Sequence, residues 1–176
     1  MKRALIISLL VLPLAALCGC GEKTPPDMPK LYPTTITITQ EGAPLADASV
    51  QLLKKGDLTY KWLVGGTTDA TGACVMRTMG KYNGAPEGDF QVVVYKTVKT
   101  ESATRKAQPN PPEDPTEAQE WAKKVDEEEK EVDYVDLKYK SVDTTDLTVT
   151  ITSGKNEQSF DVGAKVQIEN KQTLVK

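Results

Sequence analysis

Histidine is absent from the 176-residue sequence. Imidazole is the commonest general base near neutral pH and a common metal ligand, so Ser-His-Asp and Cys-His catalytic arrangements and imidazole metal sites are excluded. Phosphate-binding loops and dinucleotide fingerprints are also missing, since Gly65-Gly66 and the glycines from Gly80 to Gly88 lack the required spacing. We therefore expect no cofactor, no metal and no enzymatic activity.

Basic residues are not in excess, and cysteine is scarce. The chain has 22 basic and 25 acidic residues, and loss of the first 19 residues would leave 20 basic residues. This acidic balance disfavours a nucleic-acid partner. Of the three cysteines, Cys18 and Cys20 lie together near the start and Cys74 stands alone.

The N-terminus has the pattern of a secretory signal. Lys2 and Arg3 precede an uncharged apolar run from Ala4 to Leu17. This run is shorter than the about 20 residues of a membrane-spanning helix. Pro13 within the run also argues against a spanning helix.

The end of that run, Leu17-Cys18-Gly19-Cys20, resembles the lipobox of bacterial lipoproteins. The resemblance implies that Cys20 becomes the N-terminus and carries acyl chains, such as palmitate, which anchor the protein to a membrane. Gly21, in place of the Asp that often marks inner-membrane retention, favours the outer membrane, with the domain facing the periplasm. The alternatives are an ordinary cleaved signal with two incidental cysteines, or a buried apolar helix.

After the signal (1–19), we expect a proline-rich tether (20–33), a β domain (34–168) with an insertion at about 100–133, and a flexible tail (169–176). The tether holds four prolines, which is typical of an extended spacer. With Cys20 lipidated, Cys74 has no intramolecular partner. We therefore expect a fold without a disulfide and a buried Cys74.

Alternating apolar and polar residues predict seven or so short strands, and thus an all-β fold built as an antiparallel sandwich. The expected inward faces are Ile36 and Ile38; Ala48, Val50 and Leu52; Leu58, Tyr60, Trp62 and Val64; Phe90, Val92 and Val94; and Leu147, Val149 and Ile151. Gly80 to Gly88 is expected to be a long loop. Ser153 to Asn156 is expected to turn the chain into a closing hairpin, and Lys165 to Glu169 to form a short edge strand.

The insertion interrupts this pattern. Ser102 to Pro115 is predicted as loop, and Thr116 with Gln119 predicts a capped helix start. Trp121, Val125 and Val132 are expected near one side of this solvated helix, which docks through Trp121. The acidic residues from Asp126 to Glu131 are interpreted as a solvated face, because successive helical side chains diverge and cannot converge on one ion.

Three segments resemble the transthyretin-like, carboxypeptidase-regulatory-like β-sandwich domains. They are Gly42-x-Pro44-x-x-x-Ala48-x-Val50, Thr68-Asp69-x-x-Gly72 and Ala85-Pro86-x-Gly88-x-Phe90-x-Val92-x-Val94. The layout is similar to small planctomycete-type lipoproteins. The resemblance implies an Ig-like sandwich with an accessory or binding role. The hydroxyisourate hydrolases and intradiol dioxygenases on related folds need histidines, which this chain lacks.

These observations favour a lipid-anchored, non-catalytic protein of the cell envelope that serves protein binding or envelope assembly. The contact surface is expected at the Gly80–Gly88 loop or the Glu113–Val132 insertion, with Tyr82 and Trp121 as candidate residues. The alternative is a module that binds carbohydrate or a surface polymer through Trp62, Tyr60 and Tyr82, although core packing is the favoured role of Trp62. A carboxylate-based hydrolase is the least favoured class. Asp69, Asp143 and Asp146 are interpreted as turn residues in preference to a Ca²⁺ site.

Overall fold

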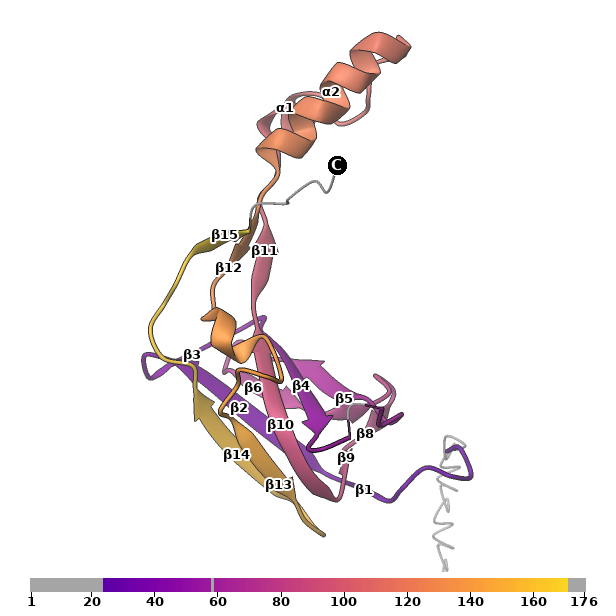
Figure 1. Ribbon diagram of the computed structural model, residues 1–176, viewed down its shortest axis with the longest axis vertical. Coiled ribbons are helices and arrows are strands. Elements are labelled where there is room, and N and C mark those ends of the chain that lie inside the picture. The colour runs from indigo at the N-terminus through magenta and orange to yellow at the C-terminus, as the bar shows by residue number, and fades with distance from the viewer. Residues whose placement is uncertain (1–23, 58, 171–176) are drawn as a thin grey trace, which may run out of the picture.

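The computed structural model describes residues 24–57 and 59–170. Strands dominate, so the predicted all-β fold is confirmed. Figure 1 shows three parts: a β-rich body, a three-stranded ribbon that rises from it, and a pair of helices at the far end of the ribbon. We call the ribbon and the helices together the arm. None of the helices in the described ranges is long and apolar enough to cross a membrane.

The larger sheet of the body has six antiparallel strands. In spatial order they are β13 (Thr148–Ile151), β10 (Gly88–Tyr95), β4 (Ser49–Lys54), β5 (Val64–Thr67), β7 (Arg77–Thr78) and β8 (Tyr82–Asn83). The longest antiparallel pairing joins β10 to β4, where Val92 lies opposite Leu52 and Val94 opposite Val50. The inward faces predicted for these two strands are therefore side by side in one sheet.

The second sheet is organised around β2 (Thr34–Gln40). β14 (Asn156–Asp161) pairs with one side of β2, while β3 (Ala43–Pro44) and β6 (Ala73–Val75) pair with the other. The β14–β2 pair is parallel, unlike the other pairs of the described chain. The predicted hairpin at Ser153–Asn156 is therefore wrong: the turn carries the chain from β13 across to the other sheet.

Both sheets bury apolar side chains in a single hydrophobic core. Ile36 and Ile38 of β2 and Phe90, Val92 and Val94 of β10 have no exposed surface. Thr35, Thr37 and Thr39, which alternate with the two isoleucines, are half-buried, as a two-residue period requires. The inward faces predicted for these strands are confirmed.

The third predicted strand starts later than expected. The Asp57 carboxylate accepts the Thr59 N–H at 3.0 Å and its hydroxyl at 2.7 Å, which holds a turn, and β5 begins only at Val64. Tyr60 packs at the edge of the core, 6.4 Å from the Phe90 ring centroid. Trp62 is half-buried outside the core, so the expectation that it packs in the core is wrong.

The region expected to be a long loop, Gly80 to Gly88, contains two short strands, β8 and β9 (Ala85–Pro86). β9 pairs with β1 (Leu31–Tyr32), which belongs to the predicted tether. At Gly84, φ is +102° and a Cβ would lie 2.5 Å from the Tyr32 carbonyl oxygen. Only glycine lets the two segments approach this closely. The end of the predicted tether is therefore paired with the body from Leu31 onward.

The ribbon consists of β11 (Thr97–Lys99), β12 (Glu131–Asp133) and β15 (Ile168–Asn170), with β12 in the middle. β15 lies where an edge strand was expected, although it starts three residues later. Asp133 is 1% exposed at the base of the ribbon. Its carboxylate accepts from the Lys140 ammonium at 2.8 Å and from the Thr97 hydroxyl. Lys140 follows the short 3₁₀ helix η1 (Leu137–Tyr139) of the body, so this contact fixes the ribbon to the body.

Candidate functional site

The two helices at the end of the arm are the most protruding part of the molecule (Figure 1). α2 (Pro115–Glu128) begins after Asp114, whose carboxylate accepts the N–H groups of Thr116 at 2.8 Å and Glu117 at 3.1 Å. Asp114 is thus the N-cap and Pro115 occupies the first helical turn, a common pattern at helix starts. The prediction that Thr116 caps the helix is wrong by two residues.

α1 (Ala103–Ala107) lies within the segment predicted as loop. The Ser102 hydroxyl oxygen accepts the Arg105 N–H at 3.0 Å and caps this short helix. α1 contains no buried residue, and Val125 is the only buried residue of α2. The apolar side predicted for the helix is shorter than expected: α2 ends at Glu128, and Val132 lies in β12. Apolar packing alone therefore does not hold the two helices together.

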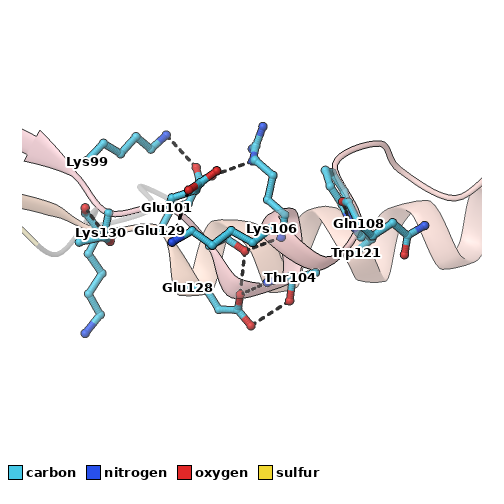
Figure 2. A network of polar contacts seen from close by, with 12 residues as sticks. Lys99, Glu101, Thr104, Lys106, Gln108, Trp121, Glu128, Glu129 and Lys130 are labelled. Atoms are coloured by element: carbon cyan, nitrogen blue, oxygen red, sulfur yellow. Dashed lines mark hydrogen bonds and ion pairs between the residues drawn. The ribbon is translucent and has the colours of Figure 1, made fainter.

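The Glu128 carboxylate joins the end of α2 to the start of α1. It accepts hydrogen bonds from the Ser102 hydroxyl at 2.7 Å, the Thr104 N–H at 2.8 Å and the Thr104 hydroxyl at 2.9 Å. Figure 2 shows Glu128 directed at Thr104. The Thr104 backbone N–H, followed by the two hydroxyls, lowers the pKa of Glu128 from its ordinary 4.5 to about 2. The ionised carboxylate is therefore part of the folded arm near neutral pH.

Glu129 makes a second link, to the ribbon. Its carboxylate lies 2.9 Å from the Lys99 ammonium of β11 and 2.8 Å from the Arg105 guanidinium of α1 (Figure 2). The hydrogen bond from Lys99 and the charge of Arg105 lower the pKa of Glu129. The acidic run was expected to be solvated throughout, and for Glu128 and Glu129 that expectation is wrong. Lys123 and Glu127, 3.9 Å apart, form an exposed pair on α2.

Trp121 lies where the two helices meet. Its indole N–H donates to the Gln108 carbonyl at 3.2 Å, and the Arg105 guanidinium lies 5.7 Å from the indole ring (Figure 2). The side chain is half-buried. Trp121 therefore docks α2, as the sequence predicted, but against α1, in a segment predicted as loop, while one part of its surface stays accessible to a partner.

The other candidate residues lie elsewhere. Tyr82, in β8, is half-buried, with the Lys81 ammonium 5.3 Å from its ring centroid. β8 belongs to the body and α2 to the end of the arm, so Tyr82 and Trp121 do not form one surface (Figure 1). Cys20 lies outside the described residues, and its lipidation stays a prediction.

The thiol of Cys74 and the carboxylates of Asp69 and Asp146 have structural roles. Cys74 is fully buried, and burial together with the charge of Asp69 raises the pKa of its thiol to about 11. Asp69 accepts from the Thr71 N–H and hydroxyl, which holds a turn as predicted. Asp146 lies 3.7 Å from the Lys138 ammonium. No group of three or more Asp, Glu or Cys residues that could hold a metal ion occurs in the described ranges.

Sequence reasoning missed two groups of residues that position the arm. One is the contact of Glu128 with Ser102 and Thr104, and the other is the ion pair of buried Asp133 with Lys140. The dipeptide Asp114-Pro115 was a readable signal for the start of α2. The contacts of Glu128 and Asp133 had no signal in the neighbouring sequence, because folding brings in partners such as Ser102 and Thr97 from distant positions.

Comparison with known proteins gives no match: no protein-family model, no curated protein and no solved structure is similar to this chain.

Proposed function

We propose that this chain is a lipid-anchored protein of the cell envelope. The membrane anchor is Cys20, and the non-catalytic β domain, an Ig-like sandwich of the transthyretin-like kind, carries the arm toward a protein partner. Gly21, which follows Cys20 where an Asp often marks inner-membrane retention, favours an outer-membrane location facing the periplasm. In this proposal the arm is the contact surface, used in protein binding or envelope assembly.

One observation carries the proposal: the helices lie at the opposite end of the molecule from β1, where the chain enters the body (Figure 1). A chain held at its N-terminus would present these helices away from the membrane surface. Nearly all side chains of α2 are exposed or half-buried, and helix formation alone does not explain a pair of helices carried so far from the core. A surface held out on rigid strands is well suited to binding.

The ion pair between buried Asp133 and exposed Lys140 supports the same role. It fixes the base of the ribbon to the body, with the two charges 2.8 Å apart. An arm that served only as a linker would not need a defined direction relative to the body. The fixed base keeps the helices pre-organised, which lowers the entropy that binding must cost.

Site-specific photo-cross-linking in intact envelopes tests the proposal. A photoreactive residue is placed at Glu120 of α2, and a control at Gln158 of β14; both positions are exposed. We expect a discrete protein adduct from position 120, identified by mass spectrometry, and none from position 158. Equal adducts at both positions, or none at 120, would remove the arm as the contact surface.

The anchor is tested separately. Cys20→Ala removes the acceptor of the acyl chains, so the variant should leave the lipidated membrane fraction and run without the mass of the acyl groups. A variant that keeps the lipid mass would show that Cys20 is not the modified residue. This result does not depend on the cross-linking result, so anchor and contact surface can fail independently.

Binding of carbohydrate or a surface polymer is the second candidate, and the position of Trp62 outside the core is the observation that favours it. However, the Lys61 ammonium lies 4.7 Å from the Trp62 ring centroid and Lys81 lies 5.3 Å from that of Tyr82. These cations cover part of the aromatic faces on which a sugar would stack. Glycan titration with tryptophan fluorescence separates the candidates, since only this second function predicts a Trp62-dependent change.

A further inference from the structure

A cleft of about 630 Å³ lies where the ribbon joins the body. Its volume falls within the range of about 300–1,000 Å³ that is typical of small-molecule sites. Leu45 comes from the body, Val98 from β11, and Val166 from the segment that leads to β15. These three side chains form an apolar wall contributed by three separate parts of the chain.

The floor of the cleft is held by hydrogen bonds. The Gln40 side-chain amide donates to the Tyr134 carbonyl at 2.9 Å and to the Ala164 carbonyl at 3.3 Å. The Tyr134 N–H in turn donates to the Lys96 carbonyl at 2.8 Å. These contacts tie the end of β2 to the segments that follow β12 and precede β15, and through Tyr134 to the segment that precedes β11, so the cleft is pre-formed.

The charge lining the cleft is positive, although the chain as a whole is acidic. Lys96 and Lys165 contribute to the lining, and no acidic residue does so within the described ranges. The Lys96 ammonium donates one hydrogen bond, to the Ala46 carbonyl at 2.8 Å, and has two further N–H groups. Asp133, next to Tyr134 in sequence, is paired with Lys140.

From this combination we propose that the cleft binds a small carboxylate that has an apolar body. The carboxylate accepts hydrogen bonds from Lys96 and Lys165, and the apolar body covers Leu45, Val98 and Val166. A charge-assisted hydrogen bond to a carboxylate is stronger than one between neutral groups. A neutral apolar ligand would leave the two lysines unpaired, and a bare inorganic anion would leave the apolar side chains uncovered.

Calorimetric titration of the full chain in nanodiscs of zwitterionic lipid tests this, with empty nanodiscs as the blank. Hexanoate is the probe. Hexanamide has nearly the same shape without the charge, and inorganic phosphate has charge without an apolar body. We expect saturable binding of hexanoate, with at least about tenfold weaker binding of the other two. Equal binding of hexanamide or of phosphate, or no binding of hexanoate, overturns the proposal.

Two lysine variants locate the site. Lys165→Gln changes an exposed side chain of the cleft and should raise the Kd for hexanoate about fivefold. Lys55→Gln is the matched control, because Lys55 follows the end of β4 that pairs with the start of β10, away from Lys96. It should leave the Kd unchanged. Equal weakening by both variants, or no weakening by Lys165→Gln, would show that the cleft is not the site.

Discussion

The body and the arm are stabilised by different forces. The body buries large apolar side chains from both sheets, among them Phe90, Ile36 and Ile151, without exposed surface. The helices of the arm bury only Val125 and are joined through the carboxylates of Glu128 and Glu129. Burial of apolar surface depends little on pH or salt, whereas contacts of partly exposed charges depend on both.

This difference indicates which conditions should destabilise the arm without unfolding the body. Mutation of the core should destabilise the whole chain, because β11 follows β10 of the body directly and β12 leads back to η1 of the body. Acid, salt or removal of one carboxylate should loosen the helices while the sheets stay intact. The two parts should thus behave as regions of different local stability.

The largest effect is expected from Phe90→Ala in the core. Loss of this fully buried ring should lower the free energy of unfolding by about 3–5 kcal/mol, since it leaves a cavity and forfeits apolar burial. Urea denaturation followed by circular dichroism measures the change, and alkylation of the buried Cys74 should accelerate in parallel. Leu63→Ala, at a residue that is 61% exposed, is the control and should stay within about 0.5 kcal/mol. A small effect of Phe90→Ala would contradict the assignment of the core.

A smaller effect is expected from a glycine pair. Both Gly72 and Gly80 have positive φ, +76° and +69°. A Cβ at Gly72 would lie 2.4 Å from the Ile38 carbonyl oxygen, whereas Gly80 has open space around it. Each alanine bears the left-handed backbone cost of about 1–2 kcal/mol, and Gly72→Ala should lose a further 1–3 kcal/mol or so through the clash. Equal urea midpoints for the two variants would show that β2 yields at this point.

Next comes Glu128→Gln in the arm. A neutral amide accepts weaker hydrogen bonds than a carboxylate, so the attachment of α1 to α2 should weaken. Hydrogen exchange should accelerate at Thr104 to Ala107, while exchange in β4 and β10 and alkylation of Cys74 stay unchanged. Glu127→Gln is the matched control, because Glu127 contacts only the exposed Lys123 in the described structure. Faster exchange in both regions would mean that the arm and the body unfold together.

Acid should remove the same contact. Because the pKa of Glu128 is lowered from 4.5 to about 2, its contribution to folding is fully present above about pH 4.5 and is lost as the pH falls through about 2. Exchange at α1 should therefore differ between the wild type and Glu128→Gln at pH 5, and the difference should vanish near pH 2. A difference that persists unchanged at that pH would show that another group holds α1.

The body was largely predictable because its signals are local. The alternation of threonine and isoleucine from Thr35 to Thr39 and the spacing of Phe90, Val92 and Val94 each specify a strand and its inward face. Sequence cannot specify which strands pair. The parallel contact of β14 with β2 joins residues 122 positions apart, such as Asn156 and Thr34, and follows from a chain that crosses between sheets.

For the candidate site, the sequence predicted its position in the chain but not the contacts that hold it. The change of pattern after Thr100 marked the insertion, and Trp121 was correctly expected to dock the helix. The contact between Ser102 and Glu128 spans 26 positions, and neither residue differs in type from the exposed polar residues around it. Likewise, Asp133 reads as one more acid in an acidic segment. Its burial depends on Lys140 and Thr97.

The smallest effect is expected at the second link of the arm. Lys99→Gln removes the charge that faces Glu129, yet Arg105 keeps the carboxylate paired at 2.8 Å. Global unfolding should not change measurably, since ion pairs with an exposed partner contribute little. Exchange at β11 should rise slightly at low salt, and about 1 M salt should abolish the difference because screening then acts within about 3 Å. Lys106→Gln, whose partner Glu101 is itself exposed, is the control and should change nothing. A large effect of Lys99→Gln on urea unfolding would mean that charge stabilises the body as well, and the contrast between body and arm would fail.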